Sequence, residues 1–120
     1  MLNGRPALIV EEEFLIALDL QRMLEGLGVG QTLFARNMME ARKLRQHWPD
    51  LAVAIVEMRA DGTDDRQLTA ELAAAAVPLV ITTGDFGLSR TVTGVIPVIV
   101  KPIPEQSLAS AIEQALATRF

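Results

Sequence analysis

Six consecutive apolar residues, LAVAIV at 51–56, stand immediately before Glu57. An unbroken apolar run of this length is typical of a strand that is buried on both faces of a parallel sheet. Residues 7–10, ALIV, repeat the pattern in front of a run of three glutamates. Shorter runs at 32–35, 77–81 and 97–100 complete the five strands that we predict.

Helical periodicity lies between these strands. Apolar residues recur every three or four positions from Ile16 to Leu27, and Gly28 follows as a C-cap. A second helix, capped by Asn37, is expected to stop at Pro49, and two more are predicted over 65–76 and after Pro104. Alternating strands and helices predict an α/β fold. The expected architecture is a doubly wound, five-stranded parallel sheet of order 2-1-3-4-5 between two helical layers.

Composition limits the kind of protein this can be. The chain has 120 residues, 11 Lys and Arg, 15 Asp and Glu, and no cysteine, and half of its residues are hydrophobic. We therefore expect one domain over residues 1–120, without a disulfide framework or a thiolate zinc site. No apolar run is long enough to span a bilayer and no signal peptide is seen, which favours a cytoplasmic protein. The acidic balance, with no basic cluster, argues against direct binding of nucleic acid.

Five polar residues stand at the carboxyl ends of the predicted strands. They are Glu11 and Glu12 after the first strand, Glu57 after the third, Thr83 after the fourth and Lys101 after the fifth. Ligands of doubly wound sheets bind outside these strand ends, near the point where the strand order reverses. We therefore expect three carboxylates, a hydroxyl and an ammonium group to meet at one edge of the sheet.

This arrangement resembles the receiver domains of response regulators, the CheY-like proteins of two-component signalling. The resemblance covers essentially residues 6–118 and includes the Lys-Pro pair at 101–102. It implies a receiver fold, which is similar to that of flavodoxins, and it implies protein partners.

The resemblance also implies roles for the five residues. Glu11 and Glu12 match the acidic pair that holds Mg²⁺ in the family, and Glu57 stands where the family has its phosphate-accepting Asp. Thr83 matches the residue that binds a phosphoryl oxygen, and Lys101 matches the lysine that pairs with the phosphate.

Glu57 departs from the family because it is longer than Asp by one methylene, about 1.5 Å. In-line transfer tolerates little misplacement, since an error of about 1 Å can cost roughly 10²-fold in rate. Mg²⁺ also needs near-octahedral oxygens at about 2.0–2.1 Å. We therefore expect inefficient phosphorylation. Either the Glu57 carboxylate reaches into the phosphoryl space and pairs with Lys101 or Thr83, or the site has decayed and Glu57 is held in local hydrogen bonds.

The segment after the fourth strand departs as well. Only seventeen residues separate Thr83 from Lys101, so we predict a short helix or a loop over 85–94. The aromatic switch residue of the family is replaced by Val98 or Ile99. Residues 81–84, ITTG, are similar to the Thr-Gly motif of variant receivers whose fourth helix is shortened.

The sequence favours an atypical receiver that is not an enzyme, has no catalytic residue and no resident cofactor, and acts through protein contacts without phosphorylation. The alternative is a phosphoacceptor that takes phosphate from a histidine kinase, with Mg²⁺ held by Glu11, Glu12 and Glu57. A small-molecule binder that uses the strand-end cleft is a third class. The expected partners are a histidine kinase, a phosphotransfer protein or a downstream regulator. We predict that residues 85–100 and the last helix form the docking or homodimer surface, with Phe86 and Leu88 in it.

Overall fold

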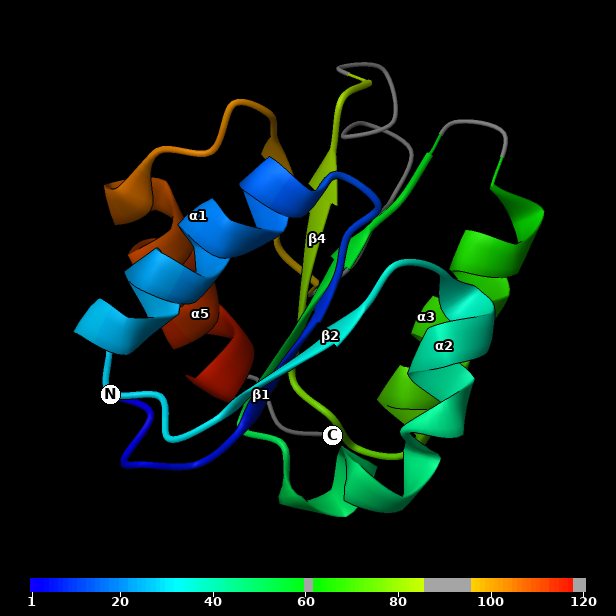
Figure 1. Ribbon diagram of the computed structural model, residues 1–120, viewed down its shortest axis with the longest axis horizontal. Coiled ribbons are helices and arrows are strands. Elements are labelled where there is room, and N and C mark those ends of the chain that lie inside the picture. Colours follow the sequence, from blue (N-terminus) through cyan, green and yellow to red (C-terminus); the bar gives the residue numbers. More distant parts are fainter. Residues whose placement is uncertain (60–61, 86–95, 118–120) are drawn as a thin grey trace.

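The structure is a computed structural model that describes residues 1–59, 62–85 and 96–117. Five parallel strands form one sheet in the order β2-β1-β3-β4-β5 (Figure 1). The strands are β1 (Ala7–Val10), β2 (Thr32–Ala35), β3 (Val53–Glu57), β4 (Leu79–Thr83) and β5 (Val98–Val100). This confirms the predicted fold class and strand order.

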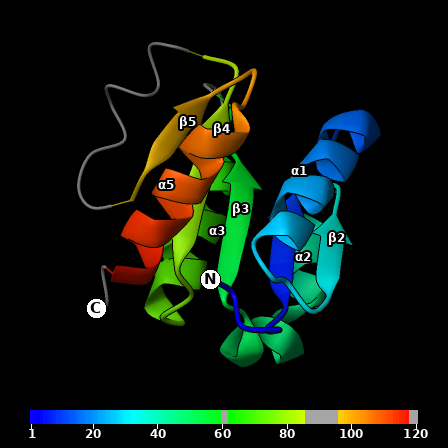
Figure 2. The same cartoon turned by 90° about the vertical axis from the view of Figure 1, so that its left-hand side faces the viewer.

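Helices cover both faces of the sheet. In Figure 2, α1 (Phe14–Gly26) and α5 (Glu105–Ala117) lie in front of the strands, and α2 (Met38–Lys43) and α3 (Thr63–Ala74) lie behind them. A 3₁₀ helix, η1 (Arg45–Asp50), follows α2. In the part of the chain that the structure describes, no helix is both long and apolar enough to cross a membrane.

The central strands are buried on both sides, which explains their unbroken apolar sequence. Successive side chains of a strand point to opposite faces. In β3, Val53 and Ile55 therefore pack under α1 and α5, whereas Ala54 and Val56 pack under α2 and α3. All four are fully buried.

Two boundaries differ from those predicted, and both have a tertiary cause. The chain does not stop at Pro49, because α2 ends at Lys43 and η1 continues through the proline. The Trp48 indole, which is buried, donates to the Ala41 carbonyl at 3.3 Å and holds this turn against α2. In the fourth strand, pairing with β5 continues to Thr83, so the strand runs two residues further than its apolar sequence.

Other expectations are met or fall elsewhere. Asn37 caps α2 as predicted, since its side-chain oxygen accepts from the Glu40 backbone N–H at 2.9 Å. The helix or loop predicted over 85–94 and the predicted contact residues Phe86 and Leu88 lie almost entirely outside the described residues.

Candidate functional site

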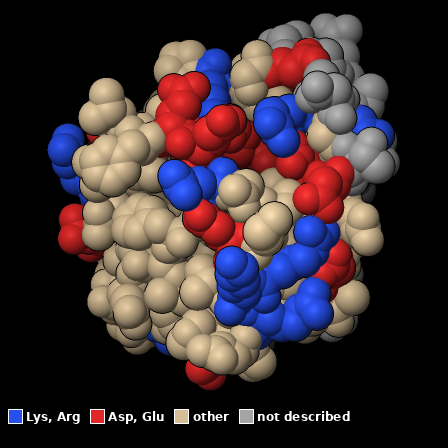
Figure 3. Space-filling model, turned by 45° about the vertical axis from the view of Figure 1, so that its right-hand side comes forward, with Lys and Arg blue, Asp and Glu red and all other residues tan. Residues whose placement is uncertain are grey.

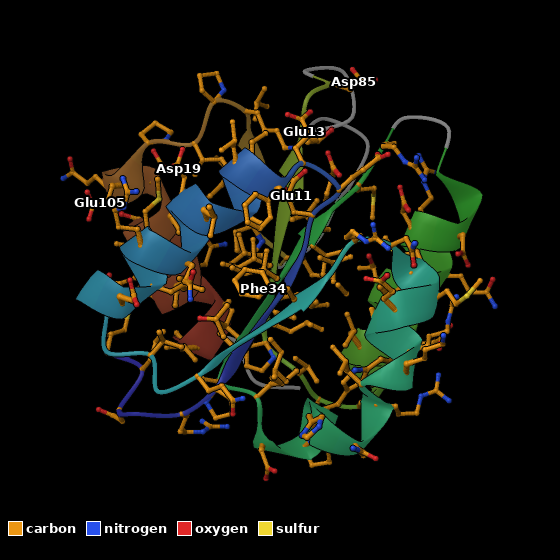
Figure 4. All side chains as sticks on the ribbon, viewed as in Figure 1. Glu11, Glu13, Asp19, Phe34, Asp85 and Glu105 are labelled. Carbon is orange, nitrogen blue, oxygen red and sulfur yellow. The ribbon has the colours of Figure 1, made fainter. Side chains whose placement is uncertain are left out.

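The strand ends carry the predicted site residues to one edge of the sheet. Glu57 and Thr83 are the last residues of β3 and β4, and Glu11 and Lys101 directly follow β1 and β5. Backbone hydrogen bonds hold the last two in register, since the Lys101 N–H donates to the Thr83 carbonyl at 2.8 Å and the Glu11 N–H donates to the Ala35 carbonyl at 3.0 Å. Figure 4 shows Glu11 at the upper end of the sheet, beside the start of α1.

Lys101 lies between two of the carboxylates. Its Nζ is 2.7 Å from Glu11 Oε1 and 2.5 Å from Glu57 Oε2. The exposed fraction of the side chain is 1% for Glu11, 14% for Lys101 and 19% for Glu57. The predicted contact between Glu57 and Lys101 is therefore confirmed, and Glu11 shares the same ammonium group.

The charges of this triad act on one another. Burial raises the pKa of the Glu11 carboxyl, and this effect outweighs the hydrogen bond from Lys101. Burial also acts to raise the pKa of Glu57, but the hydrogen bond and positive charge of Lys101 bring it below the ordinary value. Burial acts to lower the pKa of Lys101, yet its two carboxylate partners raise it overall. The ammonium form of Lys101 is thus strongly favoured at neutral pH.

The remaining oxygens of the two glutamates face backbone groups. Glu11 Oε2 accepts from the Glu13 N–H at 3.0 Å, and Glu57 Oε1 lies 3.4 Å from the Glu12 N–H. The Glu12 side chain is exposed and joins neither pair. The loop after β1 is therefore tied to the triad through its backbone.

Thr83 is brought to the same edge but takes no part in the ion pairs. Its side chain is fully buried, and its Oγ1 accepts from the Asp85 backbone N–H at 3.0 Å. Within the described residues, no hydrogen bond joins this hydroxyl to Glu57 or Lys101. The hydroxyl instead fixes the start of the segment that leaves β4.

The residues do not fit a resident Mg²⁺ in this arrangement. No three His, Cys, Asp or Glu side chains in the described part of the chain are grouped so that they could hold a metal ion. One oxygen of Glu11 and one of Glu57 lie on the Lys101 ammonium, and the other Glu11 oxygen accepts from a backbone N–H. Mg²⁺ requires near-octahedral oxygen ligands, which these engaged carboxylates do not offer.

Sequence reasoning missed a buried carboxylate beside the triad. Asp65, in the first turn of α3, is 1% exposed, and its Oδ2 accepts from the Arg59 backbone N–H at 2.9 Å. Gly62 permits this contact, because a Cβ there would lie 2.0 Å from the same oxygen. The helical phase could have revealed Asp65, since it stands three and seven positions before the fully buried Leu68 and Leu72.

A groove of about 530 Å³ opens between Glu57 and Asp65. Its wall comes from the ends of β1 and β3, the start of α2 and the start of α3. Figure 3 shows acidic side chains gathered across this end of the molecule with basic groups beside them. The strand-end edge thus carries two features, an internally paired triad and an open groove next to it.

Comparison with known proteins places this architecture. No protein-family model and no curated protein matches the sequence. Among solved structures, the chain is similar to the receiver domain of the Erythrobacter litoralis response regulator PhyR, with 21% identity and a TM-score of 0.76 over 98% of this chain and 93% of that one. It is also similar to a response regulator receiver domain protein of Clostridium thermocellum, with 23% identity and a TM-score of 0.76 over 94% of both chains.

A third similarity is to a longer protein. The anti-anti-sigma factor PhyR of Bartonella quintana is 24% identical, with a TM-score of 0.75, and the match covers 95% of this chain but 48% of that one. These likenesses, together with the strand order, show that the chain has the CheY-like fold of response-regulator receiver domains.

Proposed function

We propose that this chain is a receiver-type module of two-component or phosphorelay signalling that acts through protein contacts and is not switched by phosphorylation. The observation that carries the proposal is the Lys101 ammonium group, which is held between the carboxylates of Glu11 and Glu57. By the resemblance to receivers, this lysine stands where a phosphoryl group would be bound. Here the carboxylate of Glu57 supplies the negative charge.

Phosphoryl transfer to Glu57 faces two costs. The carboxylate has to leave a partly buried ion pair, and its extra methylene displaces the attacking oxygen from the in-line position. Misplacement by about 1 Å is enough to cost roughly 10²-fold in rate. Both effects favour a module whose resting arrangement is already internally neutralised.

Protein partners agree with the surface that the receiver resemblance points to. The described part of that surface holds a groove of about 780 Å³ between β5 and α5, with Val98, Val100, Pro102 and Ser110 in its wall. One structural neighbour is named an anti-anti-sigma factor, which supports a role in regulation by protein contact. A histidine kinase, a phosphotransfer protein or a downstream regulator is the class of partner that we propose.

A titration followed by the amide resonances of the ¹⁵N-labelled protein tests this function. Mg²⁺ is added first and beryllofluoride second, to the wild type and to Glu57→Asp. We expect little response from the wild type and saturable shifts at Thr83 and Lys101 in the variant, because shortening the side chain restores the receiver geometry. Glu113→Asp, the same change on an exposed residue of α5, should behave as the wild type.

Saturable shifts in the wild type that spread from Thr83 into the following segment would overturn the proposal. They would favour the alternative, in which Glu57 accepts phosphate from a histidine kinase with Mg²⁺. A Glu57→Asp variant that stays folded and silent would show instead that the pocket has decayed beyond this one residue.

A further inference from the structure

The groove beside the triad has more negative than positive charge in its wall. It is lined by four carboxylates and two guanidinium groups, together with Asn37 and apolar side chains. The charged residues are Glu12, Glu57, Asp64, Asp65, Arg36 and Arg59. A ligand that matches this wall therefore carries positive charge.

Some of these charges are already paired outside the groove. Asp64 lies 3.0 Å from Arg42 of α2, and Arg36 lies 3.1 Å from Glu40. Arg59 reaches Asp65 Oδ2 through its backbone N–H and, at 3.5 Å, through its Nε. These pairs leave three acceptors to consider, which are the exposed carboxylate of Glu12, Oε1 of Glu57 and Oδ1 of Asp65.

Asp65 Oδ1 is the acceptor that points to a ligand. It is buried, and it has no hydrogen-bond partner within the described residues. A buried carboxylate oxygen without a donor is costly, and native proteins seldom leave one unpaired. Because Asp65 belongs to the groove wall, the missing donor can come from a group that enters the groove.

The spacing of the acceptors selects the kind of cation. These acidic groups do not converge closely enough to hold a metal ion. A guanidinium group is larger and planar, and its five N–H donors can reach carboxylates that lie apart from one another. Met38 and Met39 also line the groove, and their polarizable side chains suit the methylenes of an arginine side chain.

We propose that this groove binds the guanidinium group of an arginine side chain presented by a partner protein, with Glu12, Glu57 and Asp65 as its acceptors. The inference rests on the proposed function only in taking the partner to be a protein. It assigns the contact to the α2 and α3 side of the strand ends, away from the surface of β5 and α5.

The test uses the ¹⁵N-labelled full chain and N-acetyl-arginine N-methylamide as the probe. We expect saturable amide shifts confined to Glu12, Met38, Met39, Arg59 and Asp65. The equivalent lysine compound should bind at least three-fold more weakly, because an ammonium is a point charge that cannot bridge separated acceptors. Mg²⁺ at the same concentration should not compete.

Two variants identify the acceptors. Glu12→Gln, an exposed change that should not disturb folding, is expected to weaken binding of the arginine probe by about two- to five-fold. Asp65→Asn is expected to weaken it by about ten-fold or more, because the lost acceptor is buried. Glu25→Gln, a matched change on an exposed residue of α1, should leave the affinity unchanged.

Several results would overturn this inference. They are the absence of saturable shifts in the groove, equal binding of the lysine compound, and full affinity in Glu12→Gln together with Asp65→Asn. None of them depends on beryllofluoride or on Glu57→Asp. A wild type that responds to beryllofluoride would therefore refute the proposed function while leaving the arginine site to be judged on its own data.

Discussion

Replacing Lys101 by methionine removes the ammonium group that lies between Glu11 and Glu57. Methionine keeps the length and most of the apolar stem of the side chain, so the change acts mainly on charge. Glu11 then holds a buried carboxylate whose Oε1 has lost its ion-pair partner. Glu57 loses the partner that brings its pKa below the ordinary value despite burial.

The expected cost follows from burial. Breaking a fully buried ion pair by removing one partner costs about 3–5 kcal/mol. Water reaches this triad in part, since the side chains of Lys101 and Glu57 are 14% and 19% exposed. We therefore expect a loss of about 2–3 kcal/mol at neutral pH, which is about 1–2 M urea at the midpoint of unfolding.

The loss should depend on pH with a definite sign. In the variant, burial without an ammonium partner keeps the pKa of Glu11 above its unfolded value, so this carboxyl destabilises the fold as pH rises through its folded pKa. Glu57 contributes stability to the wild type above its unfolded pKa, and the variant lacks that contribution. The difference between wild type and variant should be small near pH 4.5 and large at pH 7.5.

Urea unfolding at these two pH values, followed by the fluorescence of the buried Trp48, measures the effect. Lys43→Met, at an exposed position of α2, is the control and should change the midpoint little at either pH. Adding Glu11→Gln to Lys101→Met should recover part of the loss, because it removes the buried charge. A Lys101→Met midpoint within about 0.3 M of the Lys43→Met midpoint, or a loss that does not change with pH, would refute the assigned role of the triad.

Two substitutions of glycine should lower the melting temperature. Gly62→Ala would place a Cβ 2.0 Å from Asp65 Oδ2 and push the carboxylate from the Arg59 N–H, at a cost of about 1–2 kcal/mol; Gly84→Ala, where no atom lies within 4 Å, should be tolerated, and equal melting temperatures would contradict this reading. Gly30→Ala would bring a Cβ within 2.0 Å of the carbonyl oxygen of the N-terminal segment, a backbone group that cannot rotate away, and should cost about 1–3 kcal/mol in thermal unfolding. A Gly30→Ala protein that melts with the wild type would show that this segment shifts freely.

Much of the fold could be predicted because burial leaves a local pattern in the chain. The runs at 7–10 and 51–56 are apolar throughout since both faces of β1 and β3 are covered, and this continuity distinguishes a central parallel strand from an exposed one. The strand order followed from the alternation of strands and helices, and it placed Glu11, Glu57, Thr83 and Lys101 at one edge. The local pattern was weaker at Pro49, where contact between Trp48 and α2 decides the course of the chain.

The sequence by itself determined which residues meet at the strand ends, whereas the tertiary structure alone decided what they do there. Glu57 and Lys101 are 44 residues apart, and periodicity does not tell whether the glutamate selects the lysine or Thr83. That choice depends on ångström distances between neighbouring strands and on the Asp85 N–H, which occupies the Thr83 hydroxyl. The unpaired oxygen of Asp65 is likewise invisible in the sequence, because its surroundings come from three separate elements that only the folded chain brings together.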